Sequence, residues 1–136
     1  MRLVLDTNIL YSFFWKGALV TKLLLADHNL YTPEFALHKL DKHKLGILEK
    51  TKLTSQEFEE FEEKLQKAIE FVPFSKYADS ISEAFNLIPE HAKDIDFLAL
   101  ALKLDVSILS KERRLKKQSK VKIFDEKDIP SLLEKQ

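Results

Sequence analysis

The chain has 136 residues, with 22 lysines and arginines balanced by 22 aspartates and glutamates, and it contains no cysteine. This length suits one domain, which we expect to span residues 1–136, and the missing cysteines exclude a disulfide-stapled secreted fold. The balanced charge excludes a general attraction to nucleic acid, and the lack of a signal peptide or a long apolar stretch predicts a soluble, cytoplasmic protein without a membrane partner.

The first half of the chain alternates between short apolar runs and helical patterns. An apolar run predicts a strand over Arg2–Leu5, and a brief extended stretch is expected over Asn29–Thr32. Thr54 and Glu57 form a capping-box sequence, and apolar residues recur at helical spacing after it, so we expect a helix to begin there. The remaining helical patterns predict helices over Ile9–Phe14, Ala18–Ala26 and Glu34–Glu49.

The second half of the chain continues this alternation. A stretch that is apolar almost all round spans Asp94–Leu104, which indicates a helix buried on every side. Further strands are predicted over Ile69–Val72, Val106–Leu109 and Val121–Phe124, and further helices over Lys76–Leu87 and Glu126–Lys135. Strands that alternate with helices predict an α/β fold, a single three-layer domain whose central parallel sheet of about four to five strands is flanked by helices.

Three acidic residues lie beside these elements at positions that favour chemistry. Asp6 follows the first strand, Asp94 begins the buried helix, and Glu112 lies just beyond the Val106–Leu109 strand. Open parallel sheets bind ligands at the carboxyl ends of their strands, so the three carboxylates would meet if the first and fourth strands are neighbours. Hard oxygen ligands suit Mg²⁺ or Mn²⁺, which predicts metal-assisted hydrolysis of a phosphodiester. Each acid taken singly also fits the structural role of a helix cap.

Three segments appear in a fixed order along the chain: Leu3-Val4-Leu5-Asp6-Thr7-Asn8, Asp94-Ile95-Asp96-Phe97-Leu98-Ala99-Leu100-Ala101-Leu102 and Ile108-Leu109-Ser110-Lys111-Glu112-Arg113-Arg114-Leu115. Together they resemble the PIN-domain family over the whole length of the chain. The resemblance implies a parallel sheet flanked by helices and an endonuclease, dependent on Mg²⁺ or Mn²⁺, that cuts single-stranded RNA. Many members are toxins of toxin-antitoxin pairs. It also implies metal-binding and catalytic roles for Asp6, Asp94 and Glu112, with Asn8 and Ser110 as their polar neighbours.

The chain departs from the family pattern at one position. The family has a glutamate on the helix after the second strand, whereas this chain has Lys39 there. An ammonium group competes with a divalent ion for the remaining carboxylates, so we expect weaker metal binding. Two interpretations stay open: Lys39 contacts a substrate phosphate as a point charge, or it pairs with Asp6 or Asp94 in a domain that only binds RNA or a partner.

Other polar and aromatic residues near the predicted site also have two interpretations. Asp96 competes with Asp94 for the site, but residues two apart on a helix face opposite ways, and the family register favours Asp94. Lys111 and Arg113 open a basic run that ends at residue 122, either a solvated surface or a patch that contacts phosphates. The aromatic run Phe13–Trp15 could stack a base, although packing into the core is favoured.

Two functions from different classes follow from the sequence. The first is a metal-dependent endoribonuclease, toxin-like or RNA-processing, whose activity is weakened by Lys39. The second is a catalytically degenerate module that binds RNA or a protein partner. An antitoxin-type protein and a second copy of the chain are the protein partners that we consider. A doubly wound nucleotide-binding domain is disfavoured because no glycine-rich loop follows the first strand, and the chain has only Gly17 and Gly46.

Overall fold

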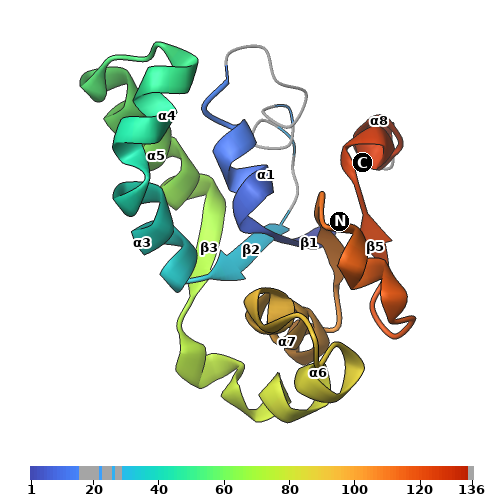
Figure 1. Ribbon diagram of the computed structural model, residues 1–136. Helices are drawn as coiled ribbons and strands as arrows, with labels where there is room; N and C mark the ends of the chain where they lie inside the picture. Colours follow the sequence, from blue (N-terminus) through green and yellow to red (C-terminus); the bar gives the residue numbers. More distant parts are fainter. Residues whose placement is uncertain (16–21, 23–25, 27–28, 135–136) are drawn as a thin grey trace.

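The computed structural model describes residues 1–15, 22, 26 and 29–134. In this part of the chain, five strands form one sheet in the order β3-β2-β1-β4-β5, and every neighbouring pair is parallel. The first strand therefore lies at the centre of the sheet, beside the fourth, which confirms the predicted parallel core (Figure 1). The strands are β1 Arg2–Leu5, β2 Asn29–Pro33, β3 Ile69–Val72, β4 Ser107–Leu109 and β5 Ile123–Phe124.

Helices cover both faces of this sheet and make a three-layer α/β fold (Figure 1). Successive side chains of a strand point to opposite faces, so Leu3 and Leu5 of β1 pack in one cluster and Val4 packs in the other. The first cluster includes α1 Thr7–Ser12, α3 Phe35–Lys42, α4 Lys44–Thr51, α5 Ser55–Ala68 and α8 Ile129–Glu134. The second cluster includes α6 Ile81–Leu87 and α7 Ile95–Leu104.

The buried helix α7 confirms the sequence prediction for this part of the chain. All five residues from Phe97 to Ala101 are buried, as expected for a helix that is apolar almost all round. Asp105 ends the helix in the left-handed conformation, with φ 56°, which aspartate tolerates better than most side chains. The chain then reaches β4 two residues later, at Ser107.

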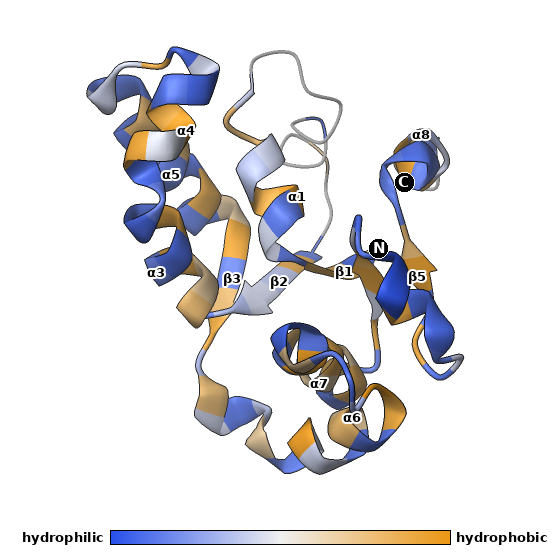
Figure 2. Cartoon of the chain, viewed as in Figure 1, coloured by the Kyte–Doolittle hydropathy of each residue, from blue (hydrophilic) through white to orange (hydrophobic). Residues whose placement is uncertain are grey.

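The helix α5 begins with the predicted capping box. The Thr54 hydroxyl accepts from the Glu57 amide, and the Glu57 carboxylate accepts from the Thr54 amide at 3.0 Å. Phe58 and Leu65 of this helix are buried against the first cluster. Figure 2 shows α3, α4 and α5 as alternating bands of hydrophilic and hydrophobic residues, the pattern of helices with one buried face.

Two predicted helices are interrupted in the structure. The expected Glu34–Glu49 helix is wrong as a continuous element, because His43, at φ −100° and ψ 11°, separates α3 from α4. The expected Lys76–Leu87 helix is wrong in its first part, which consists of the 3-10 turns η1 and η2. Tyr77 lies between these turns at φ −127°, and this break buries its ring. The short 3-10 helices are η1 Phe74–Lys76, η2 Ala78–Ser80, η3 Ala92–Asp94, η4 Arg113–Lys117 and η5 Glu126–Asp128.

The two remaining predicted helices lie near segments that the structure leaves out. The expected Glu126–Lys135 helix begins as the turn η5, and α8 follows it. Pro130 lies in the first turn of α8, where the missing N–H group of a proline costs the helix no hydrogen bond. The helix expected over Ala18–Ala26 lies outside the described residues except for residues 22 and 26. Within the described part of the chain, none of the helices combines the length and apolar character needed to cross a membrane.

The aromatic run after α1 is mostly part of the core. Phe13 and Phe14 are fully buried, and the Phe14 ring stacks on Phe58 with 4.6 Å between centroids. Trp15 differs from them because 39% of its surface is exposed. The preference for packing is therefore confirmed for the two phenylalanines.

Candidate functional site

The candidate site lies where the order of the strands reverses. From β1 the chain proceeds outward through β2 and β3, and it then crosses to β4 and β5 on the other side of β1. The carboxyl ends of β1 and β4 are therefore adjacent, which is the position where open α/β sheets bind ligands. Asp6 follows β1 at this edge, and Ser110, Lys111 and Glu112 follow β4.

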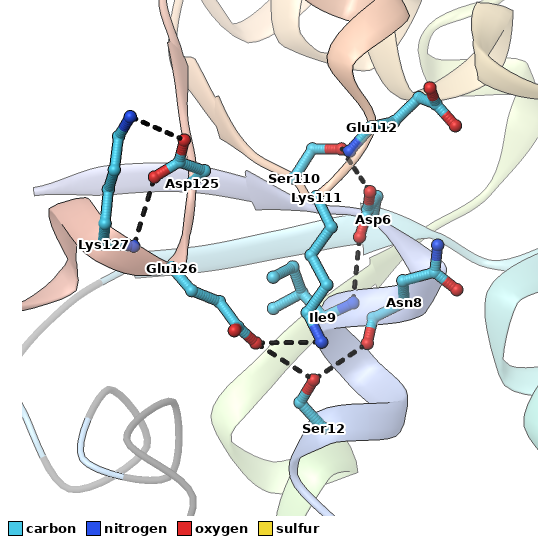
Figure 3. Close-up of polar contacts among 10 residues, drawn as sticks. All are labelled: Asp6, Asn8, Ile9, Ser12, Ser110, Lys111, Glu112, Asp125, Glu126 and Lys127. Carbon is cyan, nitrogen blue, oxygen red and sulfur yellow. Dashed lines mark hydrogen bonds and ion pairs between the residues drawn. The ribbon is translucent and has the colours of Figure 1, made fainter.

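Asp6 is held in place by hydrogen bonds from both neighbouring segments (Figure 3). One carboxylate oxygen accepts from the Ile9 amide at 2.9 Å, so Asp6 caps α1, and the other accepts from the Ser110 hydroxyl. The Thr32 hydroxyl donates to the Leu5 carbonyl oxygen at 2.8 Å and ties the end of β1 to β2. Only 6% of Asp6 is exposed, so this carboxylate is fixed before any ligand binds.

Asp94 lies beside Asp6 at the start of α7. It occupies the cap position but its side chain makes no capping hydrogen bond, so the structural role considered for it is not observed. Its Oδ2 atom is buried and has no hydrogen-bond partner among the described residues, although polar atoms in protein interiors are nearly always paired. A buried carboxylate oxygen without a hydrogen bond, at the carboxyl ends of the strands, marks a position where a ligand would be favoured.

The pKa values of these two carboxyl groups respond to burial and to each other. Burial raises the pKa of Asp6, the hydrogen bonds from Ser110 and Ile9 lower it, and the negative charge of Asp94 raises it. Burial also raises the pKa of Asp94, as does the charge of Glu112, whereas Arg114 and other cations lower it. The site is thus a cluster of mutually repelling acids in a poorly solvated place.

Glu112 is bound by an arginine on its own turn. Its Oε1 atom lies 2.9 Å from Nε of Arg114, and its Oε2 atom accepts from Nη2 of Arg114 at 2.9 Å. The Arg114 amide also donates to Oε1 at 3.2 Å, so Glu112 caps η4 as its structural role requires. The hydrogen bonds from Arg114 hold the pKa of Glu112 below its usual value. In Figure 3 the Glu112 side chain extends away from Asp6, while its amide donates to the Ser110 hydroxyl at 2.9 Å.

Lys39 acts on the acids of the site, whereas the Asp96 carboxylate is engaged elsewhere. Lys39 is half-buried on α3 with its ammonium 4.9 Å from the centre of the Phe35 ring, and its charge lowers the pKa of Asp94. It is therefore a neighbour of the site, as its position in the family pattern implied. Asp96 accepts a 2.6 Å hydrogen bond from the Tyr77 hydroxyl, so its carboxylate is engaged between α7 and η2 rather than at the sheet edge.

The remaining predicted residues line the outside of the site. Asn8 is exposed on α1, and its carbonyl oxygen accepts from the Ser12 hydroxyl at 3.1 Å. Lys111 forms a 2.9 Å ion pair with Glu126, and Arg113 is exposed. An open groove of about 780 Å³ lies beside them, lined by Ser110, Lys111, Glu112, Arg113, Lys116, Asp125, Glu126 and Lys127.

The donor set suits a hard divalent ion held by few protein ligands. Within the described ranges, no three histidine, aspartate or glutamate side chains converge to hold a metal ion. The Asp94 oxygen, which has no hydrogen bond, and the neighbouring Asp6 carboxylate nevertheless fit Mg²⁺ or Mn²⁺, which bind one or two carboxylates and keep several waters. The residues present therefore fit such an ion with fewer carboxylate ligands than the sequence predicted, because Glu112 is engaged by Arg114.

Arg114 is a residue of the site that the sequence pattern did not single out. Its Nη2 atom contacts Glu112 and also lies 3.8 Å from Oδ2 of Asp94, so it touches two of the three predicted acids. The signal in the sequence was a basic residue close after Glu112, but that signal was equally strong for Arg113. Only the path of the η4 turn shows which of the two arginines faces the acids.

The fold and the site define an α/β protein with acidic residues grouped at the switch point of a parallel sheet. The family model described as PIN domain matches residues 4–120, and the chain belongs to this family. No curated protein sequence matches the chain.

Two solved structures share the fold. The crystal structure of VapBC2 from Rickettsia felis, bound to a DNA fragment from their promoter, has a TM-score of 0.66 and 16% identity, covering 92% of this chain and 98% of that one. The crystal structure of FitAcB from Neisseria gonorrhoeae has a TM-score of 0.59 and 18% identity, covering 93% of this chain and 98% of that one. At these identities the likeness concerns the fold, and it extends over nearly the full length of both chains.

Proposed function

We propose that the chain is a divalent-metal-dependent endoribonuclease that hydrolyses phosphodiester bonds of single-stranded RNA. One observation supports this most strongly: at the switch point of the sheet, the charge of Asp94 acts on buried Asp6, and Oδ2 of Asp94 is buried without a hydrogen bond. Membership of the PIN domain family agrees with a nuclease. The third acid, Glu112, is engaged by Arg114, and Lys39 replaces a fourth, so the proposed activity is weak.

The proposed mechanism assigns a separate task to each residue. Asp6 and Asp94 would hold Mg²⁺ or Mn²⁺, and a bound ion supplies a lowered pKa for water and stabilisation of charge on a phosphate oxygen. Ser110 orients the Asp6 carboxylate through its hydroxyl, and the Ile9 amide fixes the second oxygen. Lys39 places a positive charge beside Asp94, where it attracts the scissile phosphate.

The groove beside the acids is the proposed path of the RNA. Lys111 and Arg113 are exposed along it and would contact backbone phosphates. Such contacts release counterions, so RNA affinity should fall as salt rises, with a slope that reports the number of phosphates contacted. A single-stranded chain suits an open groove because its backbone bends to follow the lining.

Cleavage of labelled single-stranded RNA in the presence of Mn²⁺ tests the proposal. We expect Asp6→Asn and Asp94→Asn each to reduce the rate on the order of 100-fold or more, as loss of a preorganised charged group does. The control is Asp79→Asn, because Asp79 is an exposed acid that pairs with Lys103 away from the site. Circular dichroism verifies that the variants fold. Cleavage that persists unchanged in both site variants would exclude the assignment.

A second candidate function is a module that binds RNA or a protein partner without cutting. The half-buried ammonium of Lys39 beside Asp94 favours it, because this charge opposes a divalent ion. In that case Lys39→Glu should produce metal-dependent cleavage where the original chain shows none. Lys42→Glu, an exposed change on the same helix, gives the matched control. If Lys39→Glu remains inactive with Mn²⁺ and the chain shows no salt-sensitive RNA binding, this candidate is excluded.

We also propose an antitoxin-type protein and a second copy of the chain as partners, acting in the cytoplasm where the RNA substrate occurs. The fold shared with VapBC2 and FitAcB supports this, together with the toxins known in the family. Expression in a bacterial host should slow growth, and the Asp6→Asn variant should not. Light scattering after size-exclusion chromatography gives the mass of the protein, and a monomer at all concentrations would exclude the homodimer.

A further inference from the structure

Arg114 is the cation that contacts the acids of the site directly. Its guanidinium binds both oxygens of Glu112 at 2.9 Å in a two-point contact, a geometry that lysine cannot reproduce. The same Nη2 atom lies 3.8 Å from the buried Oδ2 of Asp94. One nitrogen therefore bridges two acidic residues that come from separate parts of the chain.

This bridge does what a divalent ion would do for the same acids. Asp94 and Glu112 repel each other, and a positive charge between them offsets that repulsion. Arg114 supplies this charge from within the chain, but at 3.8 Å it leaves the Asp94 oxygen without a hydrogen bond. The neutralisation of Asp94 is thus incomplete, and the position still favours a further ligand.

The position of Arg114 also makes the bridge displaceable. Its side chain is 44% exposed, compared with 13% for Asp94, and it lies on a short 3-10 turn at the rim of the groove. Exposed ion pairs contribute little to stability, so a competing cation or an approaching phosphate displaces the guanidinium at small cost. Release of the guanidinium leaves Oε2 of Glu112 open to a new partner, while Oε1 keeps the hydrogen bond from the Arg114 amide.

We propose that Arg114 is an intramolecular competitor of the divalent ion, bridging Asp94 and Glu112 until metal or an RNA phosphate displaces it. This inference rests on the proposed metal-dependent function and assigns regulation of the same site. Arg114 is a positioning residue here, since it acts through the two acids. The sequence offers a close control in Arg113, an exposed arginine of the same turn for which the described part of the chain shows no ion pair.

Direct titration with Mn²⁺, without RNA, tests the inference. Isothermal titration calorimetry measures Mn²⁺ binding, and electron paramagnetic resonance measures the Mn²⁺ that stays free in solution. Both methods compare the original chain with Arg114→Gln, Arg114→Lys and Arg113→Gln. We expect Arg114→Gln to bind Mn²⁺ about two- to fivefold more tightly, the range that an exposed ion pair implies. Arg114→Lys should fall between, because it keeps the charge without the two-point contact. Arg113→Gln has the same net charge as Arg114→Gln and should change the affinity much less.

Each other outcome overturns the inference. Weaker Mn²⁺ binding by Arg114→Gln would mean that Arg114 prepares Glu112 as a ligand. An equal increase in Mn²⁺ affinity in Arg114→Gln and Arg113→Gln would mean that only the net charge of the protein matters. An absence of measurable Mn²⁺ binding in every variant would show that Arg114 does not limit metal binding. The RNA cleavage assay remains separate. A chain that cuts RNA while Arg114→Gln leaves Mn²⁺ affinity unchanged keeps the proposed function and loses this inference alone.

Discussion

Ser110 is the residue that joins the two strands of the site. Its side chain is 1% exposed, and its hydroxyl donates to Asp6 while accepting from the Glu112 amide. One small side chain thus orients a carboxylate that follows β1 and the backbone that follows β4. The family pattern implied a polar neighbour of the acids at this position, and the two hydrogen bonds show how the hydroxyl contacts them.

Replacing Ser110 by alanine should therefore destabilise the fold. The change leaves the buried Asp6 carboxylate and the Glu112 amide each without one partner, and an unsatisfied buried polar group costs about 1–3 kcal/mol. Urea unfolding monitored by circular dichroism measures the loss, and the exposed Ser119→Ala is the matched control. Equal midpoints for the two variants would contradict the role that we assign to the hydroxyl.

Glu62 lies away from the site, and its raised pKa should make the stability of the fold depend on pH. Burial raises the pKa of this carboxyl most, a hydrogen bond with Asp41 and the charge of Asp41 add to the shift, and together they bring the pKa from its usual 4.5 to about 7. The folded chain therefore holds this proton more tightly than the unfolded chain does. Its contribution to stability is present below about pH 4.5 and is lost as the pH rises toward 7.

Glu62→Gln should remove this pH dependence, because glutamine resembles the protonated acid at every pH. We expect the melting temperature of Glu62→Gln to exceed that of the original chain at pH 8 by more than it does at pH 5. Glu49→Gln, on the exposed surface of α4, controls for the loss of one negative charge. If the difference between the two pH values is the same for both variants, Glu62 does not titrate in this range.

Among the secondary-structure elements, those with strong local signals could be predicted from the sequence. β1 and β3 are short apolar runs, α5 has its capping box, and α7 is apolar almost all round, so local patterns were sufficient. The break at His43 had no such signal, since neither glycine nor proline occurs there. The edge contact of its ring with Tyr11, 6.1 Å between centroids, is a tertiary contact with α1 that no local pattern encodes.

The acids of the site were predictable for a different reason. A parallel sheet brings the carboxyl ends of its strands to one edge, so Asp6 and Glu112 could be placed there once the strands were recognised. The direction of the Glu112 side chain could not be inferred in this way. It depends on the η4 turn, whose five residues bring Arg114 back onto Glu112.

The capping hydrogen bond at the start of α5 should contribute measurably to stability. Thr54→Ala removes the hydroxyl that accepts from the Glu57 amide at 3.1 Å, and loss of such a cap costs about 0.5–2 kcal/mol. Urea unfolding should show this loss, whereas Ser55→Ala at the next position places a good helix former in the first turn and should cost little. A Thr54→Ala variant as stable as Ser55→Ala would indicate that packing of Phe58 and Leu65 alone positions the helix.

At the scale of the whole molecule, the balanced charge conceals a local arrangement. Three lysines of the basic run after Ser110 pair with acids of other segments: Lys111 with Glu126, Lys116 with Asp125 and Lys120 with Glu83. These ion pairs link the run to the segment around η5 and to α6, so the run contributes to the surface structure as well as to the groove. An RNA phosphate must compete with carboxylates there, which favours weak and salt-sensitive binding.

The two apolar clusters predict how the chain unfolds. Both clusters are built on the same central strands, because Leu5 and Leu109 belong to one and Val4 and Ile108 to the other. Neither layer of helices can separate without exposing a face of β1 and β4, so residues 1–136 should unfold as a single domain in one cooperative step. Urea titration tests this with two probes: fluorescence of the single tryptophan, Trp15, which follows α1, and hydrogen exchange of the α7 amides. Coincident midpoints are expected, and an earlier transition at α7 would show that the second layer unfolds independently.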